Sequence, residues 1–234
     1  MSKTFVLVHG AWHGGWCWRR VAELLRAQGH TVFTPTLTGL ADRSHLLAPG
    51  VGLDIHVTDV VNLLTWEQLS DVVLCGHSYG GMIITGVAEK MQPAIQSIVY
   101  LDAFVPLNGE SVFDLTGPAV HKVLREAQEK NLIAVPPRSA EAFGVNEADR
   151  AWVDSQCTPQ PIATFTEKLA VTGAHERIGK KTYIRAASYP SPGFDAALAR
   201  VKADPSWRTY SAPCGHDVMV DAPEWLTKIL LEVA

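Results

Sequence analysis

One stretch limits what this chain can fold into. Residues 72–81 read Val-Val-Leu-Cys-Gly-His-Ser-Tyr-Gly-Gly, so four apolar residues run directly into the motif Gly-x-Ser-x-Gly, with Ser78 at its centre. The residues from Met82 to Lys90 have the character of a helix. Strand, tight turn and helix in this order form the context of a nucleophile elbow, which presents the serine Oγ above the end of the strand. This context favours a reactive serine over a glycine-rich turn with an incidental one.

Length and charge exclude several classes of protein. A chain of 234 residues fits one sizeable domain with room for a small insertion. The composition, with 47% hydrophobic and 19% charged residues, is that of a globular protein. A net charge of −4 without a basic block argues against nucleic-acid binding, and no apolar run approaches the ~18 residues of a membrane span. We therefore expect neither a nucleic acid nor a membrane as a partner.

The N-terminal residues and the cysteines both favour a cytoplasmic protein. The chain runs directly into an apolar stretch at residues 4–8, without the charged, apolar and small-residue parts of a signal peptide. Cys17, Cys75, Cys157 and Cys214 show neither a Cys-x-x-Cys pair nor the spacing of metal ligands. We expect free thiols in a reducing compartment and no bound metal.

Strand patterns alternate with helical ones on both sides of the motif. The expected strands cover residues 4–9, 31–34, 72–77, 96–101, 182–187 and 207–211, and the expected helices cover residues 18–28, 54–66 (with Asp54 as N-cap), 82–90 and 222–233. Such alternation predicts a mostly parallel sheet with helices on both faces. Ligands bind such sheets beyond the carboxyl ends of the strands, where Ser78, Asp102 and the glycine-rich loop 10–16 all fall.

Residues 107–180 break this alternation. Short helical pieces at residues 119–130 and 147–156 are separated by proline-rich joints. We interpret this segment as a small helical cap, called the cap segment below. It is inserted into an α/β core formed by residues 1–106 and 181–234.

A serine hydroxyl is a poor nucleophile at neutral pH and needs a base within hydrogen-bond reach. His216 lies in the loop before the final helix, where the base is expected in this arrangement. Of the nine histidines, five lie on helices, early loops or the cap segment without such a placement. His9, His13 and His77 belong to the glycine-rich loop and the elbow, where they are expected to line or brace the pocket. We therefore predict that His216 is the base.

The acid that orients this base has several candidates. Its usual place, just after the strand before the last, holds no carboxylate until Asp195, beyond two prolines. Asp102 closes the strand that follows the elbow helix, and a carboxylate there is costly unless it is paired. We prefer Asp102, with Asp195 as the alternative acid and Asp217, or no acid, as the remaining options. Asp102 could also serve only to cap backbone N–H groups of the next turn.

Three segments together resemble a known family. Residues 5–16, 76–82 and 103–106 resemble the methyl-salicylate esterase and hydroxynitrile lyase branch of the α/β-hydrolases, including its bacterial esterases. The resemblance covers both ends of the core well and the cap segment poorly. It implies an α/β-hydrolase fold and a cofactor-free Ser–His–Asp enzyme with Ser78 and His216 in their usual places. It also implies an oxyanion hole formed by the N–H groups of Ala11 and Tyr79.

The chain departs from this family at the acid. The family's aspartate position near residues 188–189 holds Ser188 and Tyr189 here. Relocation of the acid to the position of Asp102 is known elsewhere in the superfamily, so the resemblance supports that residue.

The resembled branch contains both hydrolases and lyases. The lyases carry a threonine at the position of Gly10 and a lysine directly after the base histidine, where this chain has Asp217. Without that cation a leaving cyanide has no electrostatic partner, so ester hydrolysis is favoured over a hydroxynitrile lyase. A slow-turnover ligand-binding protein is the second alternative, because a fold does not fix a function.

Aromatic residues indicate the expected substrate. Trp12 and Phe104 from the core and Trp152 from the cap segment are expected to line the substrate pocket. Further candidates are Tyr79, Phe113, Phe143 and Phe165. An apolar pocket suggests small aryl or short-chain alkyl esters. The expected partner is thus a small-molecule ester, while a homodimer stays open.

Overall fold

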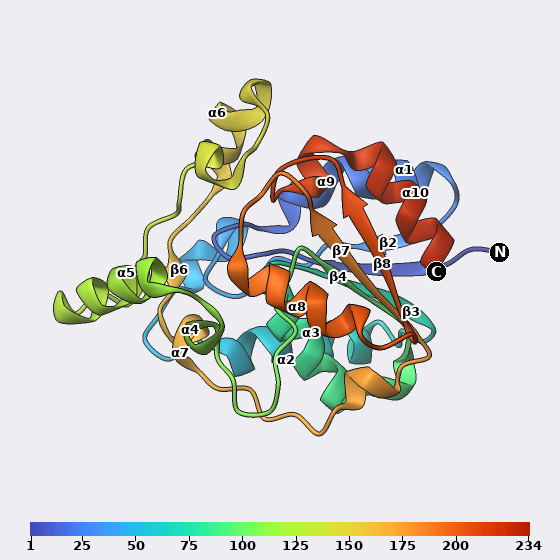
Figure 1. Cartoon of the computed structure of the whole chain (residues 1–234), viewed down its shortest axis with the longest axis horizontal. Helices are drawn as coiled ribbons and strands as arrows, with labels where there is room; N and C mark the ends of the chain where they lie inside the picture. The colour runs from blue at the N-terminus through green and yellow to red at the C-terminus, as the bar shows by residue number, and fades with distance from the viewer.

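Six parallel strands form one sheet in the order β2-β1-β3-β4-β7-β8 in the computed structural model, which describes residues 1–234 (Figure 1). The strands are β1 (Thr4–Val8), β2 (Thr31–Phe33), β3 (Val72–His77), β4 (Ile95–Leu101), β7 (Lys180–Ala186) and β8 (Trp207–Ala212). The central strands β1, β3 and β4 are apolar and almost fully buried, as expected of a parallel sheet covered on both faces, whereas the edge strands β2 and β8 are partly exposed. The predicted sheet is therefore confirmed.

Successive side chains of a strand point to opposite faces of the sheet, and β1 shows this directly. Val6 and Val8 join the core on one face, and Phe5 and Leu7 join the core on the other. Helices α2 (Leu53–Trp66), α3 (Gly80–Met91) and α8 (Pro192–Lys202) cover the first face. Helices α1 (Arg19–Ala27), α9 (Val218–Asp221) and α10 (Pro223–Val233) cover the second (Figure 1).

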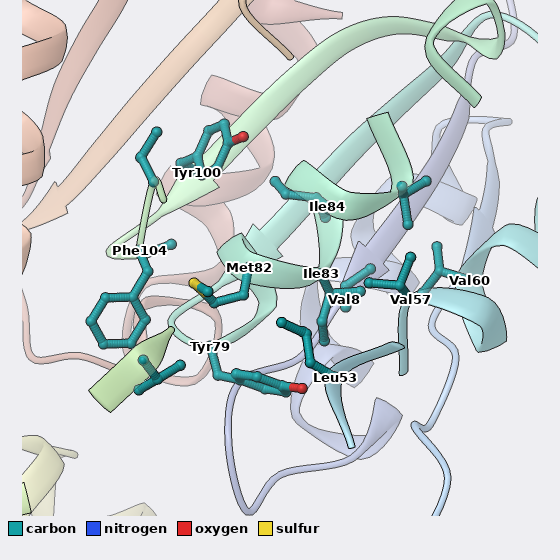
Figure 2. Packing of buried hydrophobic residues seen from close by; sticks show 14 of the residues in the cluster. Val8, Leu53, Val57, Val60, Tyr79, Met82, Ile83, Ile84, Tyr100 and Phe104 are labelled. Carbon is teal, nitrogen blue, oxygen red and sulfur yellow. The ribbon is translucent and has the colours of Figure 1, made fainter. Parts of the chain in front are cut away.

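The close packing of α2 and α3 over the sheet is seen in Figure 2. Val57 and Val60 of α2 lie beside Ile83 and Ile84 of α3, above Val8 of the sheet. All five side chains are buried, so the elbow helix is held by apolar contacts along its length. The helix that carries the nucleophile turn is thereby fixed rigidly to the sheet.

The strand order places the predicted site. The chain moves from β1 outward to β2 in one direction and from β3 through β4 to β8 in the other. The loops after β1 and β3 therefore diverge at the carboxyl edge, and this switch point is where ligands of open α/β sheets bind.

The observed elements differ from the predicted ones in two places. Asp54 does not cap α2: the N-cap is Gly52, and the Asp54 carboxylate instead accepts from Lys90 at 3.0 Å. Helix α8 was not predicted, although Ser191 at its N-cap and Pro192 in its first turn mark a helix start.

The cap segment contains four short helices and a two-stranded antiparallel sheet. They are α4 (Val112–Leu115), α5 (Pro118–Glu129), α6 (Glu147–Gln156), α7 (Ala163–Thr166), β5 (Ala134–Val135) and β6 (Gln160–Pro161). Figure 1 shows α5 and α6 projecting away from the main sheet. The 3₁₀ helices of the chain are η1 (Gly15–Trp18), η2 (Ala41–Leu46), η3 (Gln92–Ala94), η4 (Ala140–Phe143) and η5 (Ala174–Arg177). The division of the chain at residues 107 and 181 stays a prediction.

All four cysteines are free thiols, as expected. None of the helices combines the length and the apolar character needed to cross a membrane.

Candidate active site

Ser78 sits on a strained turn between β3 and α3. Its φ angle is +54°, in the left-handed region that non-glycine residues rarely adopt. Its N–H donates to Leu101 at 3.1 Å, and its carbonyl accepts from Phe104 at 3.2 Å. The preceding Gly76 leaves no room for a side chain, because a Cβ there would lie 2.5 Å from the carbonyl oxygen of Gly80. These contacts give the elbow geometry that the motif predicted.

Asp102 follows β4 and is fully buried, with a φ angle of +43°. Its Oδ2 lies 2.6 Å from Nδ1 of His216. Its Oδ1 accepts from the N–H of Ala186 at 3.0 Å and from the guanidinium of Arg185 at 2.6 Å. The carboxylate is thus paired on both oxygens and does not merely cap the next turn.

Asp195, the alternative acid, makes no contact with His216. It lies in the first turn of α8, where its Oδ1 accepts from Nε of Arg185 at 2.9 Å. Its side chain is 63% exposed. Asp102 and Asp195 therefore bind different nitrogens of the same arginine, and only Asp102 reaches the histidine.

His216 lies in the loop between β8 and α9 and is held from several directions. Its backbone N–H donates to the backbone carbonyl of Phe143 in the cap segment at 2.8 Å. Its own carbonyl accepts from Nε2 of His77 at 3.0 Å. The ring of Tyr189 stacks on its imidazole with centroids 4.5 Å apart. Because Nδ1 faces Asp102, Nε2 is the nitrogen left for Ser78, and both residues line the same pocket.

The contact between Phe143 and His216 depends on a tight crossing of two glycines. Gly144 has a φ angle of +75°, and a Cβ on Gly215 would lie 2.3 Å from the carbonyl oxygen of Gly144. Only glycine at position 215 allows the cap segment to approach the histidine loop this closely.

Ala11 and Tyr79 present backbone N–H groups that donate to no other group of the protein. The peptide group before Ala11 is held by His9, whose Nδ1 donates to the carbonyl of Gly10 at 2.8 Å. Nε2 of His9 accepts from Leu37 at 3.1 Å, which fixes the neutral tautomer. Burial lowers the pKa of His9 to about 3, so the ring stays neutral.

The side chain of Tyr79 is held by a hydrogen bond to His56 and does not contact the backbone N–H of Tyr79. Its hydroxyl lies 3.1 Å from Nδ1 of His56, whose Nε2 donates to the carbonyl of Thr38. Burial lowers the pKa of His56 to about 4 and raises the pKa of Tyr79, so both groups are neutral. Figure 2 shows the Tyr79 ring among the apolar side chains at this end of α2 and α3.

A buried ion pair lies behind the site and was not anticipated from the sequence. Nε2 of His13 lies 3.0 Å from Oδ2 of Asp217, and Nδ1 of His13 donates to the carbonyl of Ala11 at 2.8 Å. Burial opposes both charges, but Asp217 raises the pKa of His13, and His13 lowers the pKa of Asp217 to about 2. Asp217 thus pairs with His13, whereas Nδ1 of His216 bonds Asp102, so Asp217 is not the acid that orients His216.

His77, His216 and Asp217 place donor atoms within 4.8 Å of one another. His77 and His216 each direct one ring nitrogen to a protein acceptor, and Asp217 is paired with His13. Protein partners therefore occupy one atom of each of these residues, Nδ1 of His77 and Oδ1 of Asp217 have no hydrogen-bond partner, and we propose no metal site there.

The pocket at this edge has a volume of about 400 Å³. Its 23 lining residues include Ala11, Trp12, Ser78, Tyr79, Phe104, Phe143, Phe165, Tyr189, Phe194 and His216. Trp12 and Phe104 lie where they were expected. Trp152 does not line the pocket, because its ring packs edge-on against Trp16 at 5.2 Å under the guanidinium of Arg20.

Two more features of the pocket bear on its chemistry. Arg138, at the mouth, is the only lysine, arginine, aspartate or glutamate among the lining residues. Asp217, the residue directly after His216, does not line the pocket. The position after His216 therefore contributes neither a lysine nor an acidic side chain to the pocket. Phe113, another candidate from the sequence, stacks on His121 outside the lining.

Comparison with known proteins agrees with this arrangement. A model described as the alpha/beta hydrolase family matches residues 5–229. A carbendazim hydrolyzing esterase from Nocardioides sp. (strain SG-4G) is 43% identical over 236 residues, which cover 97% of this chain and 98% of that protein. Methylesterase 1 from Arabidopsis thaliana is 39% identical over 119 residues, which cover 45% of this chain and 41% of that protein.

The fold has close matches among solved structures. An extracellular alpha/beta-hydrolase from a Paenibacillus species matches with a TM-score of 0.87 at 24% identity, covering 99% of both chains. The sequence matches and the six-stranded fold lead to the same conclusion. The chain belongs to the alpha/beta hydrolase family.

Proposed function

We propose that this protein is a serine hydrolase that cleaves small carboxylic esters through an acyl-enzyme. One observation carries the proposal: Nδ1 of His216 lies 2.6 Å from the buried Asp102 carboxylate, in a pocket that also exposes Ser78 on its elbow. Nucleophile, base and acid on three different loops of one edge are what acyl transfer requires. The named esterases among the relatives support the same reaction class.

In the acylation step, Oγ of Ser78 attacks the acyl carbon while Nε2 of His216 takes its proton. Asp102 holds the imidazole in the tautomer with Nδ1–H and stabilises the imidazolium that forms. No hydrogen bond joins Ser78 to His216 here, and such contacts in ligand-free enzymes commonly tighten when substrate binds. His216 then protonates the leaving alcohol as the carbon–oxygen bond breaks.

The N–H groups of Ala11 and Tyr79 stabilise the negative oxygen of the tetrahedral intermediate. Donors of this kind contribute about 3–4 kcal/mol each to transition-state stabilisation. His9 and His13 hold the carbonyls of Gly10 and Ala11, so the loop is oriented before substrate arrives. In deacylation His216 activates a water, which attacks the acyl carbon and releases Ser78.

The pocket indicates the substrate class. Its walls are mainly apolar, with 13 hydrophobic residues among 23, and its volume of about 400 Å³ suits a single small ring system with a short acyl or alkyl group. We propose small aryl or short-chain alkyl esters, a class that agrees with the methylesterase and carbendazim hydrolyzing esterase names of two relatives. The absence of a lysine after His216 disfavours a hydroxynitrile lyase.

The test is hydrolysis of p-nitrophenyl acetate, p-nitrophenyl butyrate, methyl salicylate and carbendazim by the wild type and by Ser78→Ala. We expect the substitution to lower kcat by at least about 10³-fold. Wild-type activity equal to that of Ser78→Ala on every ester would refute the proposal. Mandelonitrile cleavage would then favour a lyase, and micromolar binding of aryl esters without turnover would favour a slow ligand-binding protein.

A further inference from the structure

We propose that Arg185 is a positioning residue that sets the basicity of His216 by holding a positive charge against Asp102. The inference rests on the proposed function, since it concerns the same acid and base. Arg185 is near the end of β7, the strand that neighbours β4, and is only 7% exposed. Its guanidinium lies 2.6 Å from Oδ1 of Asp102, on the far side of the carboxylate from His216.

Four acceptors fix the orientation of this guanidinium. It donates to Asp102, to the carbonyls of Ala186 and Tyr189 at 2.7 and 2.6 Å, and to Asp195. The bond to Tyr189 matters because the ring of that residue stacks on His216. Arg185 therefore orders both the carboxylate behind the imidazole and the aromatic ring on its face.

The charge of Arg185 has a direct electrostatic consequence. The Asp102 carboxylate stabilises the imidazolium form of His216, and a cation in contact with that carboxylate offsets part of the stabilisation. Burial opposes the charge on Arg185, but Asp102 and Asp195 raise its pKa, so it carries a full charge at all working pH values. The base is consequently weaker than it would be beside an unpaired Asp102.

No other cation contacts Asp102. The remaining ionisable groups around Asp102 and His216 are His77, Arg138, Tyr183, Tyr189, Asp195, Cys214 and Asp217, of which Arg138 lies on the pocket side and bonds the Tyr189 hydroxyl, not Asp102. Burial and the nearby His216 lower the pKa of His77, which is therefore neutral. Asp217 is neutralised by His13. Arg185 is thus the group whose removal changes the charge at Asp102 most.

The test compares Arg185→Met and Asp195→Asn. Removing the cation favours imidazolium, so in Arg185→Met the NMR titration midpoint of the His216 ring and the acid limb of kcat/KM should move up by about one pH unit. Removing the exposed Asp195 leaves Arg185 less neutralised, so Asp195→Asn should move both readouts slightly the other way. Arg185→Lys keeps the charge and should stay within about 0.3 pH units of wild type, although it loses hydrogen bonds to the loop.

Opposite shifts in the two variants are the result expected of an electrostatic role. An unshifted midpoint in Arg185→Met, or shifts of the same sign in both variants, would overturn the inference and leave Arg185 only structural. If Arg185→Met does not fold, Arg185→Gln, which also removes the charge but keeps polar contacts, takes its place and should show the same upward shift. The NMR titration does not depend on turnover. If the esterase proposal fails, the protein will hydrolyse no ester, but the titration midpoint of His216 can still be measured in each variant.

Discussion

Replacing Asp217 with asparagine should destabilise the fold by about 2 kcal/mol at pH 5.5, with an effect that shrinks as the pH rises. Asp217 is fully buried and pairs with His13, which in turn holds the carbonyl of Ala11. Asparagine has nearly the same shape and keeps a hydrogen bond to Nε2 of His13, accepting from the charged ring through its oxygen or donating to the neutral ring through its amide N–H. The change therefore isolates the charge and leaves the packing in place.

The magnitude follows from the pKa of Asp217, which His13 lowers from 3.8 to about 2 against the effect of burial. At 1.36 kcal/mol per pKa unit, this difference is worth about 2 kcal/mol of folding free energy at pH values above 4 at which His13 is still protonated. Removing one partner of a buried pair can cost about 3–5 kcal/mol when a charge is left unpaired. We expect the smaller value here because His13 can release its proton, given an ordinary pKa of 6.5.

The pH dependence has a definite sign. Asp217 raises the pKa of His13 in the folded wild type, so that stabilisation is complete below pH 6.5 and is lost as the pH rises through the raised pKa. In Asp217→Asn, burial acts on His13 without a counter-charge and favours the neutral ring. The unfolding free energy of the variant should therefore increase with pH between about 5.5 and 8, while that of the wild type does not.

Urea unfolding followed by tryptophan fluorescence at pH 5.5, 6.5, 7.5 and 8 measures this difference. Glu141→Gln, which breaks the exposed pair with Arg150, is the control, and it should cost less than about 1 kcal/mol with no change in the pH slope. A constant difference between wild type and Asp217→Asn across this range would show that His13 carries no charge in the folded protein. That result would refute the assignment of an ionised His13.

Two further substitutions, each compared with a second variant, test the site itself. Asp102→Asn should lower kcat for ester hydrolysis by about 10³–10⁴-fold while the protein stays folded, and Asp195→Asn should keep most of it; the reverse result would make Asp195 the acid. Gly10→Ala should lower kcat at least about tenfold, because its Cβ would lie 2.9 Å from both His77 and the Cβ of Ser78, whereas Gly179→Ala meets nothing within 4 Å and should keep full activity.

Local patterns were enough to place the elbow and the sheet. The apolar run before Ser78 and the glycines around it describe one turn, and no distant residue is needed to recognise it. His216 could be located by its order along the chain, before the last helix. The pairing of His216 with Asp102, which the sequence left open between several carboxylates, needs the adjacency of β4 and β7.

The residues that sequence reasoning missed act through long-range contacts. Arg185 reads as an ordinary strand residue, and its partners Asp102 and Asp195 come from two other elements. His13 and Asp217 are 204 positions apart, so no spacing rule connects them. Helix α8 is a different case, because the pattern of Ser191, Pro192 and the apolar residues that follow could have revealed it.

The bond from His216 to the carbonyl of Phe143 limits how this enzyme can be re-engineered. Exchange of the cap segment is an obvious route to new specificity, since that segment supplies much of the pocket wall. A transplanted cap that lacks the Phe143–Gly144 turn would leave the His216 loop without its anchor, whatever the fit of its pocket to a new ligand. Libraries should therefore diversify α4 and α5 and retain residues 140–145, which support the His216 loop.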